Sequence, residues 1–243
     1  MKTLSAQEIL EIWEWGQDKH PVDRALCLLA LTEPELTIEQ IASLTIGQRN
    51  RRLLSLREKI LGPKLDGLAN CPKCHTALEF SVDVDSLLQP EPSANEYTFN
   101  VEGFDVTLHL PNSWDIVKLV GCDDVNIARQ LLIDRCLTRL THDNHEIQAT
   151  ELPDSVMAHI VSVIIEHDPQ IEMRFQLSCI DCNHTWSAIF DIVSFLWTEL
   201  GAFTKRLLLD VHTLAYTYGW NETDILSMSA IRRQFYLELH NDG

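Results

Sequence analysis

The motifs Cys71-Pro72-Lys73-Cys74 and Cys179-Ile180-Asp181-Cys182 decide how this chain is expected to fold. Each is a Cys-x-x-Cys knuckle, in which the two-residue spacer lets both sulfurs reach one ion. Alternating apolar and polar residues flank both knuckles, which predicts that each knuckle forms the turn of a β-hairpin. Four thiolates at this spacing predict one structural zinc ion (Zn2+), with no coordination position left for a catalytic water.

Other cysteine chemistry and other ligands are weaker alternatives for these motifs. A single Cys-x-x-Cys pair could be redox-active, but two pairs in matching hairpins, without a thioredoxin-like βαβ context, argue against a disulfide or redox role. His75 and His184 lie beside the knuckles and could replace a ligand, although four cysteines already complete the set. The remaining thiols, Cys27, Cys122 and Cys136, have no ligand spacing and are expected to be small buried apolar residues.

The two knuckles are far apart along the chain, with 104 residues between Cys74 and Cys179. Closing a loop of that length costs on the order of 4 kcal/mol of chain entropy. Zinc binding at structural sites is worth roughly 10–16 kcal/mol near neutral pH. Metal binding can therefore dominate the closure of this loop.

The segments around the knuckles are predicted to be mostly helical. In the segment 1–63, three hydroxyl residues are each followed three positions later by Glu or Gln, which is the pattern of a capping box. The pairs are Ser5 and Glu8, Thr37 and Gln40, and Thr45 and Gln48. Between the knuckles we predict a hairpin over 97–110 and helices over 113–121, 123–137 and 153–167. Apolar residues at spacings of three and four predict a long helix over 192–219, and Asn221 and Ser229 open two short ones.

These elements predict an α+β fold that is mainly α-helical, with a central four-cysteine, zinc-ribbon-like β element that a helical insertion interrupts. The expected regions are N-terminal helices at 1–63, the split β element with its inserted hairpin and helices at 64–191, and a long helix followed by short helices at 192–243. At 243 residues and 45% hydrophobic content, the chain can bury a full core.

The charge of the chain disfavours nucleic-acid binding. The formal net charge is -17, and an acidic surface repels phosphates, so nucleic-acid binding is not expected. The cationic run Arg49, Arg51, Arg52, Arg57 and Lys59 is expected to be a solvated helix face or an intramolecular partner of acidic side chains, with docking of an acidic partner as the alternative.

The sequence also lacks membrane and enzyme signals. No run of 18 apolar residues or signal-peptide block occurs, so the protein is expected to stay in the cytoplasm without membrane insertion. Gly-x-Gly-x-x-Gly, P-loop, Gly-x-Ser-x-Gly and His-Glu-x-x-His motifs are absent, so no enzyme activity is predicted. The cluster Glu166, His167 and Asp168, followed by Pro169, is expected to be an exposed helix end.

Several short stretches occur in a characteristic order along the chain. They are Leu44-Thr45-Ile46-Gly47-Gln48-Arg49, Leu54-x-Leu56-Arg57-Glu58, Gly62-Pro63, Cys71-Pro72-x-Cys74-x-x-x-Leu78-Glu79-Phe80, Leu110-Pro111-Asn112-Ser113-x-Asp115, Cys179-x-x-Cys182-x-His184-x-Trp186, Tyr218-Gly219-Trp220-x-Glu222-x-Asp224-Ile225-Leu226 and Arg232-Arg233-x-x-Tyr236-Leu237-Glu238-Leu239. In these stretches the chain resembles the baseplate hub assembly chaperones of contractile-tailed phages and related contractile injection systems. The resemblance covers nearly the whole chain.

This resemblance implies a non-enzymatic protein that acts in assembly of a contractile-tail baseplate or its hub, inside the producing bacterium, through contacts with baseplate or hub proteins. It leaves open whether the protein departs after assembly or remains in the particle. His75 stands where such knuckles commonly carry Gly, which questions the turn geometry. Two alternatives remain: a zinc-ribbon, transcription-related regulator that contacts nucleic acid or polymerase, and a thiol oxidoreductase. Candidate aromatic contacts with partners, or core residues, are Trp13, Trp15, Trp197, Tyr218 and Trp220.

Overall fold

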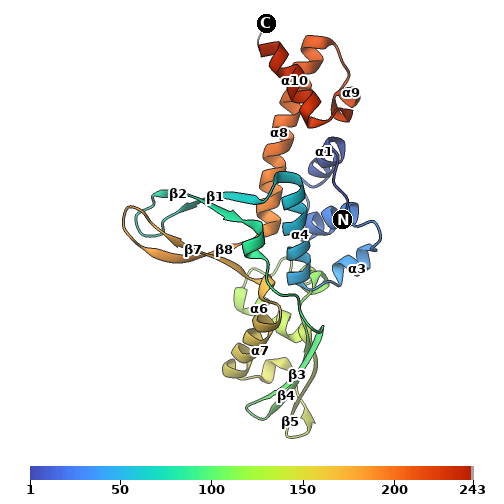
Figure 1. Cartoon of the computed structure of the whole chain (residues 1–243). Coiled ribbons are helices and arrows are strands. Elements are labelled where there is room, and N and C mark those ends of the chain that lie inside the picture. The colour runs from blue at the N-terminus through green and yellow to red at the C-terminus, as the bar shows by residue number, and fades with distance from the viewer. Residues whose placement is uncertain (242–243) are drawn as a thin grey trace. The chain divides into compact units, whose positions relative to one another are not determined.

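A computed structural model describes residues 1–241, and the chain divides into two compact units (Figure 1). One unit is the continuous segment Glu35–Ile192, which contains both knuckles. The other combines Met1–Pro34 with the segment that begins at Val193. The three regions 1–63, 64–191 and 192–243 remain a prediction about how the chain is organised.

The unit Glu35–Ile192 begins with helices α3 (Ile38–Ala42) and α4 (Ile46–Leu61). Both start with the predicted capping boxes, in which Thr37 and Thr45 accept hydrogen bonds from the amides three residues on. α4 ends at Gly62, whose φ of +92° favours glycine, and Pro63 follows.

The predicted hairpins at the two knuckles are present. The first pairs β1 (Lys64–Asn70) with β2 (Ala77–Asp83), and the second pairs β7 (Met173–Ser178) with β8 (Thr185–Phe190), both antiparallel. An aromatic contact joins the hairpins, because the Phe175 ring centroid lies 5.1 Å from that of Phe80. Within the second hairpin, the same ring lies 4.9 Å from that of Phe190. A short 3₁₀ helix, η1 (Val84–Leu87), follows β2.

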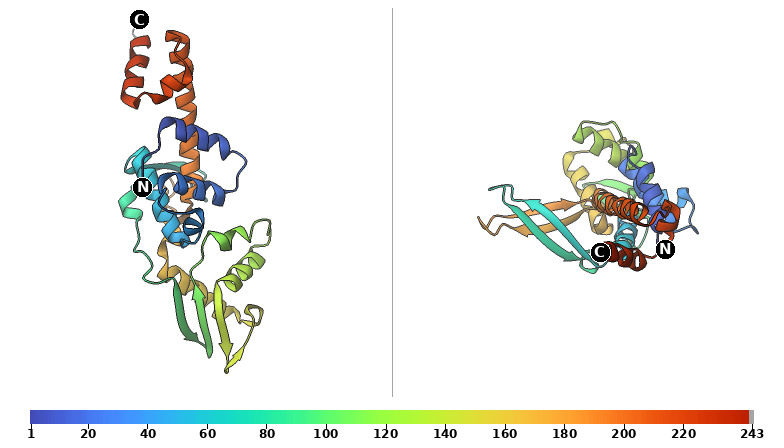
Figure 2. Two further views of the ribbon diagram at one scale, coloured as in Figure 1. Left: turned by 90° about the vertical axis from the view of Figure 1, so that its right-hand side faces the viewer. Right: turned by 90° about the horizontal axis from the view of Figure 1, so that it is seen from above.

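The part of the chain that connects the two hairpins forms a sheet in the order β3-β4-β5-β6. Figures 1 and 2 show this sheet away from the paired hairpins. β3 (Glu96–Val101) and β4 (Phe104–His109) form the predicted hairpin. β5 (Leu137–His142) and the two-residue β6 (His145–Glu146) were not predicted; they pair antiparallel around a turn in which Asp143 and Asn144 have φ of +50° and +65°. The chain therefore leaves the predicted helix at residue 136 and returns to the sheet.

The helices of this insertion are α5 (Ser113–Val117), α6 (Val125–Cys136) and α7 (Asp154–His167), with the 3₁₀ helices η2 (Ala149–Glu151) and η3 (Pro169–Ile171). α5 is shorter than the predicted helix over 113–121. α7 lies against the sheet, because the His167 ring stacks on Tyr97 at 3.9 Å. The core of this region consists of Phe104, Val106, Leu108, Leu110, Ile133, Leu140, Ala149, Leu152, Val156, Ile160 and Ile164.

A buried polar network joins α4 to η3, and one of its members contradicts the sequence analysis. Asp168 was expected at an exposed helix end, yet it is fully buried. Its Oδ2 accepts a 2.9 Å hydrogen bond from the Gly47 amide. Nearby, Asn50 donates to the Gln170 carbonyl at 3.2 Å. The network ties two segments that are 121 residues apart.

The expectation of a fully solvated cationic face on α4 is also wrong for two residues. Arg49 and Arg57 are 7% and 3% exposed. Arg57 donates to the carbonyls of Gly62 and Lys64 at 2.7 and 2.6 Å, which fixes the passage from α4 into β1. Arg51 forms the predicted kind of intramolecular ion pair, with Glu91 at 3.1 Å.

Stability is expected to depend on the pH through Asp168. Burial raises the pKa of its carboxyl, although the hydrogen bond from Gly47 opposes the shift. The folded state therefore keeps this proton at pH values where the unfolded chain has lost it, so its contribution to stability declines as the pH rises above about 4. We expect Asp168→Asn to remove this decline, as measured by urea unfolding between about pH 4 and 7. An unchanged pH profile would contradict the assignment.

The second unit is helical in its described part. It contains α1 (Ala6–Trp15), α2 (Pro21–Thr32), nearly all of α8 (Ile192–Tyr218), α9 (Glu222–Ser227) and α10 (Ala230–Asn241), in agreement with the predicted long helix and short helices. One of its apolar cores comprises Leu10, Leu207, Val211, Leu214, Ile225 and Leu226. In the part of the chain that the structure describes, no helix is long and apolar enough to cross a membrane.

The candidate contact aromatics divide between core and surface. Trp13 and Trp220 pack against the apolar core of this unit. The Trp197 ring lies 4.5 Å from the Arg24 guanidinium, and a Cβ at position 16 would come within 2.1 Å of it, so glycine is required there. Trp15 and Tyr218 are 45% and 36% exposed, which leaves these two available for contacts.

Candidate metal centre

The two knuckles have the same backbone geometry. In the first, the His75 amide donates to the Cys71 carbonyl at 2.9 Å and the Cys71 amide donates to the Thr76 carbonyl at 2.9 Å. In the second, Asn183 donates to Cys179 at 3.0 Å and Cys179 donates to His184 at 2.9 Å. Each turn therefore presents its two sulfurs in the same way.

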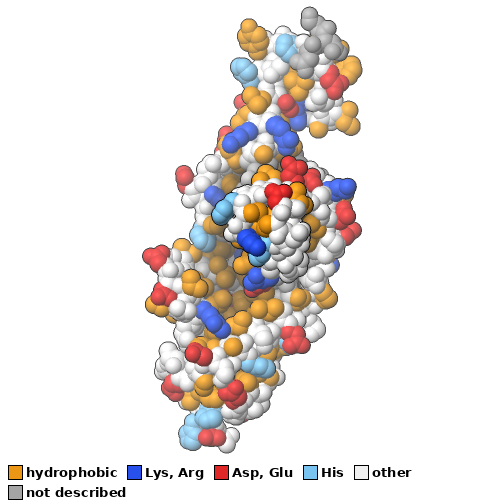
Figure 3. Space-filling model, turned by 90° about the vertical axis from the view of Figure 1, so that its left-hand side faces the viewer, with side chains coloured by type: hydrophobic (Ala, Val, Ile, Leu, Met, Phe, Trp, Pro, Cys, Tyr) orange, Lys and Arg blue, Asp and Glu red, His pale blue; other side chains and the backbone are white. Residues whose placement is uncertain are grey.

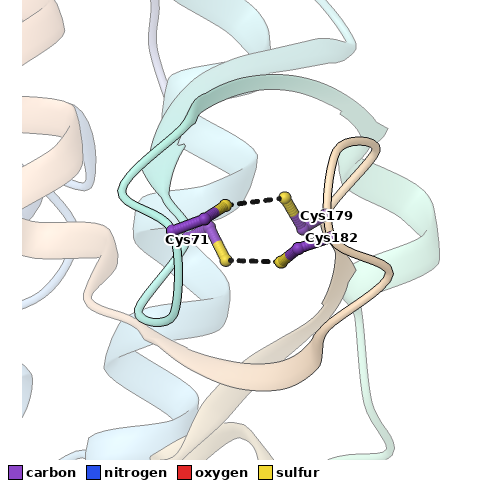
Figure 4. A group of neighbouring side chains, drawn as sticks. Cys71, Cys179 and Cys182 are labelled. Atoms are coloured by element: carbon purple, nitrogen blue, oxygen red, sulfur yellow. Dashed lines mark hydrogen bonds between the residues drawn. The ribbon is translucent and has the colours of Figure 1, made fainter.

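The four cysteine sulfurs meet between the hairpins. Figure 4 shows Cys71 of the first hairpin facing Cys179 and Cys182 of the second. The Sγ atoms of Cys71 and Cys182 are 3.7 Å apart, those of Cys74 and Cys179 are 3.4 Å apart, and all four lie within 4.8 Å of one another. All four cysteines are free. The structure thus brings together all four sulfurs that the sequence predicted.

This arrangement fits a tetrahedral metal ion. Zn–S bonds of about 2.3 Å place the sulfurs of a tetrahedral site about 3.8 Å apart, close to the observed separations. Disulfide bonding would require about 2.05 Å. Cys71 and Cys179 are buried, so the centre is partly enclosed by the hairpins. Leu78 and Trp186 add apolar contacts on the buried side, whereas Cys74 is exposed.

The thiols of the cluster differ in acidity. Hydrogen bonding with the side chain and then the backbone of Thr76 lowers the pKa of Cys74 to about 6. At Cys182 a backbone hydrogen bond from His184 favours the thiolate, but loss of hydration and the neighbouring sulfurs raise the pKa to about 12. Several thiolates held this close repel one another, and a divalent cation relieves that repulsion.

The other cysteines lie outside this set. Cys136 is buried, as predicted, and burial, reinforced by Asp115, raises its pKa to about 12. Cys27 and Cys122 are only half-buried, so their expected full burial is wrong. His184 faces the Trp186 ring at 6.1 Å rather than adding to the sulfur set.

A second group of potential ligands, His109, Asp115 and Cys136, was not singled out by sequence. Its polar atoms already have protein partners. Asp115 accepts from the Asn112 amide and pairs with Arg135, both at 3.1 Å. Both His109 ring nitrogens lie 3.0 Å from backbone carbonyls, of Leu110 and Arg135. We therefore assign this group a structural role, which joins β4, α5 and α6.

The surface around the knuckles carries mixed charge. The hairpin tips face the viewer in Figure 3, where acidic, basic, histidine and hydrophobic side chains are interspersed. The first knuckle exposes Lys73 and His75, and the second exposes Asp181 and Ile180, the latter by 80%. A surface without an excess of positive charge gives phosphates no favourable site.

The residue after each knuckle has a left-handed backbone, and this leads to a stability prediction. φ is +63° at His75 and +54° at Asn183. Left-handed backbone costs most residues roughly 1–2 kcal/mol, whereas glycine adopts it freely and asparagine tolerates it. We expect His75→Gly to raise the free energy of unfolding by about 1 kcal/mol. Asn183→Gly is the matched control and should raise the free energy of unfolding by less. If urea unfolding shows equal changes in the two variants, or a larger gain for Asn183→Gly, this explanation is wrong.

These features define a mixed α/β protein in which two hairpins, separated by a long insertion, meet at a four-cysteine centre. The chain belongs to the family described as T4 bacteriophage base plate protein, which it matches over residues 28–197. The match spans both knuckles and the whole insertion. No curated protein and no solved structure matches the chain. Family membership confirms the baseplate part of the resemblance.

Proposed function

We propose that this protein is a non-enzymatic assembly factor of a phage-like contractile-tail baseplate or its hub, and that one structural zinc ion holds its zinc-ribbon-like hairpin pair. The convergence of four cysteine sulfurs in a member of a baseplate family carries the proposal. Cys71, Cys74, Cys179 and Cys182 would hold the ion. Bound zinc would supply cross-linking and charge neutralisation here, and the hairpins themselves orient the sulfurs.

Baseplate assembly requires recognition of other proteins, and the fold is suited to that task. A cross-link between hairpins 104 residues apart along the chain would stiffen the unit that carries the insertion. A stiff surface loses less conformational entropy when it binds a partner. The partners we propose are baseplate or hub proteins, met in the cytoplasm of the producing bacterium. A regulator that contacts nucleic acid finds no support in the family match or in the charge of the hairpin tips.

Co-expression tests the assembly role. The full chain, tagged, is co-expressed with each baseplate and hub protein of the same contractile tail in turn, and the purified products are measured by size-exclusion chromatography with light scattering. We expect a defined complex with at least one of them. Elution as a separate species in every pairing would overturn the proposal. Metal analysis of the same preparations should give about one zinc per chain.

A further inference from the structure

A groove of about 450 Å³ lies beside the inserted sheet, away from the knuckles in sequence. α6 forms one wall, through residues that include Leu131 and Asp134. The strand β5 and the segment from Glu146 to Thr150 form the rest. The groove combines apolar side chains such as Leu137 and Ile147 with charged ones, so it differs from an ordinary core cavity.

One side of the groove is an incomplete sheet edge. On the side away from β4, β5 pairs with β6 only at Thr141 and His142, and the Leu140 carbonyl accepts from the Ile147 amide at 3.2 Å. Among the described strands, none pairs with the stretch 137–139 on that side. Unpaired strand edges offer backbone donors and acceptors to a further strand.

The charged side chains at the groove are not neutralised within the described part of the chain. Asp134, Glu146 and Arg139 are exposed, and no ion pair involves any of the three. Two carboxylates against one guanidinium leave a negative balance, within a chain of net charge -17. A basic segment therefore complements the groove better than an acidic one.

The helix that walls the groove is poorly covered. In the twelve residues of α6, only Ile133 and Cys136 are buried. Val125, Ile127 and Leu131 are 80%, 55% and 42% exposed. Helices of this length gain most of their stability from packing of an apolar face. Of these three residues Leu131 lines the groove, so a bound segment would cover α6 at that position.

We infer that this groove binds an extended segment of a partner protein, in which basic and apolar residues alternate, by adding a strand to the open edge of β5. The backbone of the segment would pair with 137–139, its apolar side chains would face Leu131 and Leu137, and its cations would face Asp134 and Glu146. This inference rests on the proposed function, because it names the surface that a baseplate partner would use.

A model peptide tests the groove directly. The probe is a fluorophore-labelled peptide of alternating lysine and valine, and the control probe has the same composition with its lysines in one block. Fluorescence anisotropy with the full, zinc-loaded chain should show binding of the alternating peptide at least about tenfold tighter than that of the block peptide. Amide hydrogen exchange should slow at Thr138, whose backbone shares the open edge with that of Leu140. Protection at β3 instead, equal binding of the two peptides, or no binding at millimolar peptide would overturn the inference.

Variants separate the groove from general electrostatics. Asp134→Lys combined with Glu146→Lys should lower the affinity for the alternating peptide by at least about tenfold. Glu166→Lys combined with Asp154→Lys makes the same change in charge on α7, outside the groove. This double variant should lower the affinity for the alternating peptide by less than about threefold. Equal loss in both double variants would show that net charge alone binds the peptide.

The baseplate co-expression assay distinguishes failure of this inference from failure of the proposed function. If the wild-type chain forms a complex and the groove double variant forms it equally well, the partner binds elsewhere and the inference is wrong while the assembly role stands. If the wild-type chain forms no complex, the assembly role fails, and the peptide experiment still decides whether the groove accepts a strand. Zinc content measured on each variant confirms that the knuckles are intact.

Discussion

Cys179→Ser is expected to abolish stoichiometric zinc binding and to unfold the hairpin pair. Cys179 is 2% exposed and its Sγ lies 3.4 Å from that of Cys74, so serine leaves a buried hydroxyl in place of a ligand. Zinc binding at such sites is worth roughly 10–16 kcal/mol, which matches or exceeds the total stability of a typical domain, about 5–15 kcal/mol. Metal analysis of the purified variant and its thermal unfolding with and without chelator measure both effects.

Cys122→Ser provides the matched control for this variant. Cys122 is half-buried, and its thiol makes only a 3.5 Å contact with the Asp124 carbonyl among the described residues. Its replacement should leave the zinc content unchanged and shift the free energy of unfolding by less than about 1 kcal/mol. A Cys179→Ser protein with wild-type melting temperature, or a wild-type protein that chelator does not destabilise, would refute a structural metal centre.

The centre could be predicted from sequence because its information is local. Each knuckle needs only four residues and the alternation on either side, and the structure brings the four sulfurs within 4.8 Å of one another. The helix starts were predictable for the same reason, since a capping box such as that of Thr45 and Gln48 is complete within four residues. What spacing alone could not show was that the residue after each knuckle takes a left-handed backbone.

The strand β5 was missed because its signal competes with that of the helix before it. α6 ends at Cys136 without glycine or proline, and β5 begins at the next residue. The alternation in 137–142 is weak, since only Leu140 is fully buried. Asp143 and Asn144 have positive φ in a tight turn. Asp and Asn favour such turns, so this pair was the sequence signal that could have indicated a hairpin.

The burial of Asp168 could not be read from its neighbours, because its partner lies 121 residues away. A carboxylate before or beside a proline at a helix end is usually exposed, and the sequence offers nothing local to reverse that expectation. Gly47 looked equally ordinary, as the second residue of a helix. Only the fold shows how the two residues depend on each other. Gly47 has no Cβ, which leaves space for the Asp168 carboxyl group, and this group accepts a hydrogen bond from the Gly47 amide.

Gly47→Ala is expected to be the most destabilising replacement outside the metal centre. A Cβ at position 47 would lie 1.7 Å from Oδ1 and 2.5 Å from Cγ of the buried Asp168, so either the Asp168 side chain leaves its place or α4 and η3 separate. Overpacking typically costs about 1–3 kcal/mol, and loss of the 2.9 Å hydrogen bond from the Gly47 amide to the buried Asp168 carboxyl group adds about 1–3 kcal/mol. Urea unfolding should therefore show a loss of roughly 3–5 kcal/mol.

A double-mutant cycle isolates the cause of this loss. Asp168→Ala removes both Oδ1 and Cγ, the atoms that an alanine at position 47 would meet. Gly47→Ala should then cost less than about 1 kcal/mol when introduced into the Asp168→Ala protein, which corresponds to a coupling energy of at least about 2 kcal/mol. Additive losses would show that position 47 needs glycine for a reason other than Asp168, and the close contact between α4 and η3 would lose its role in fixing the insertion beside the hairpins.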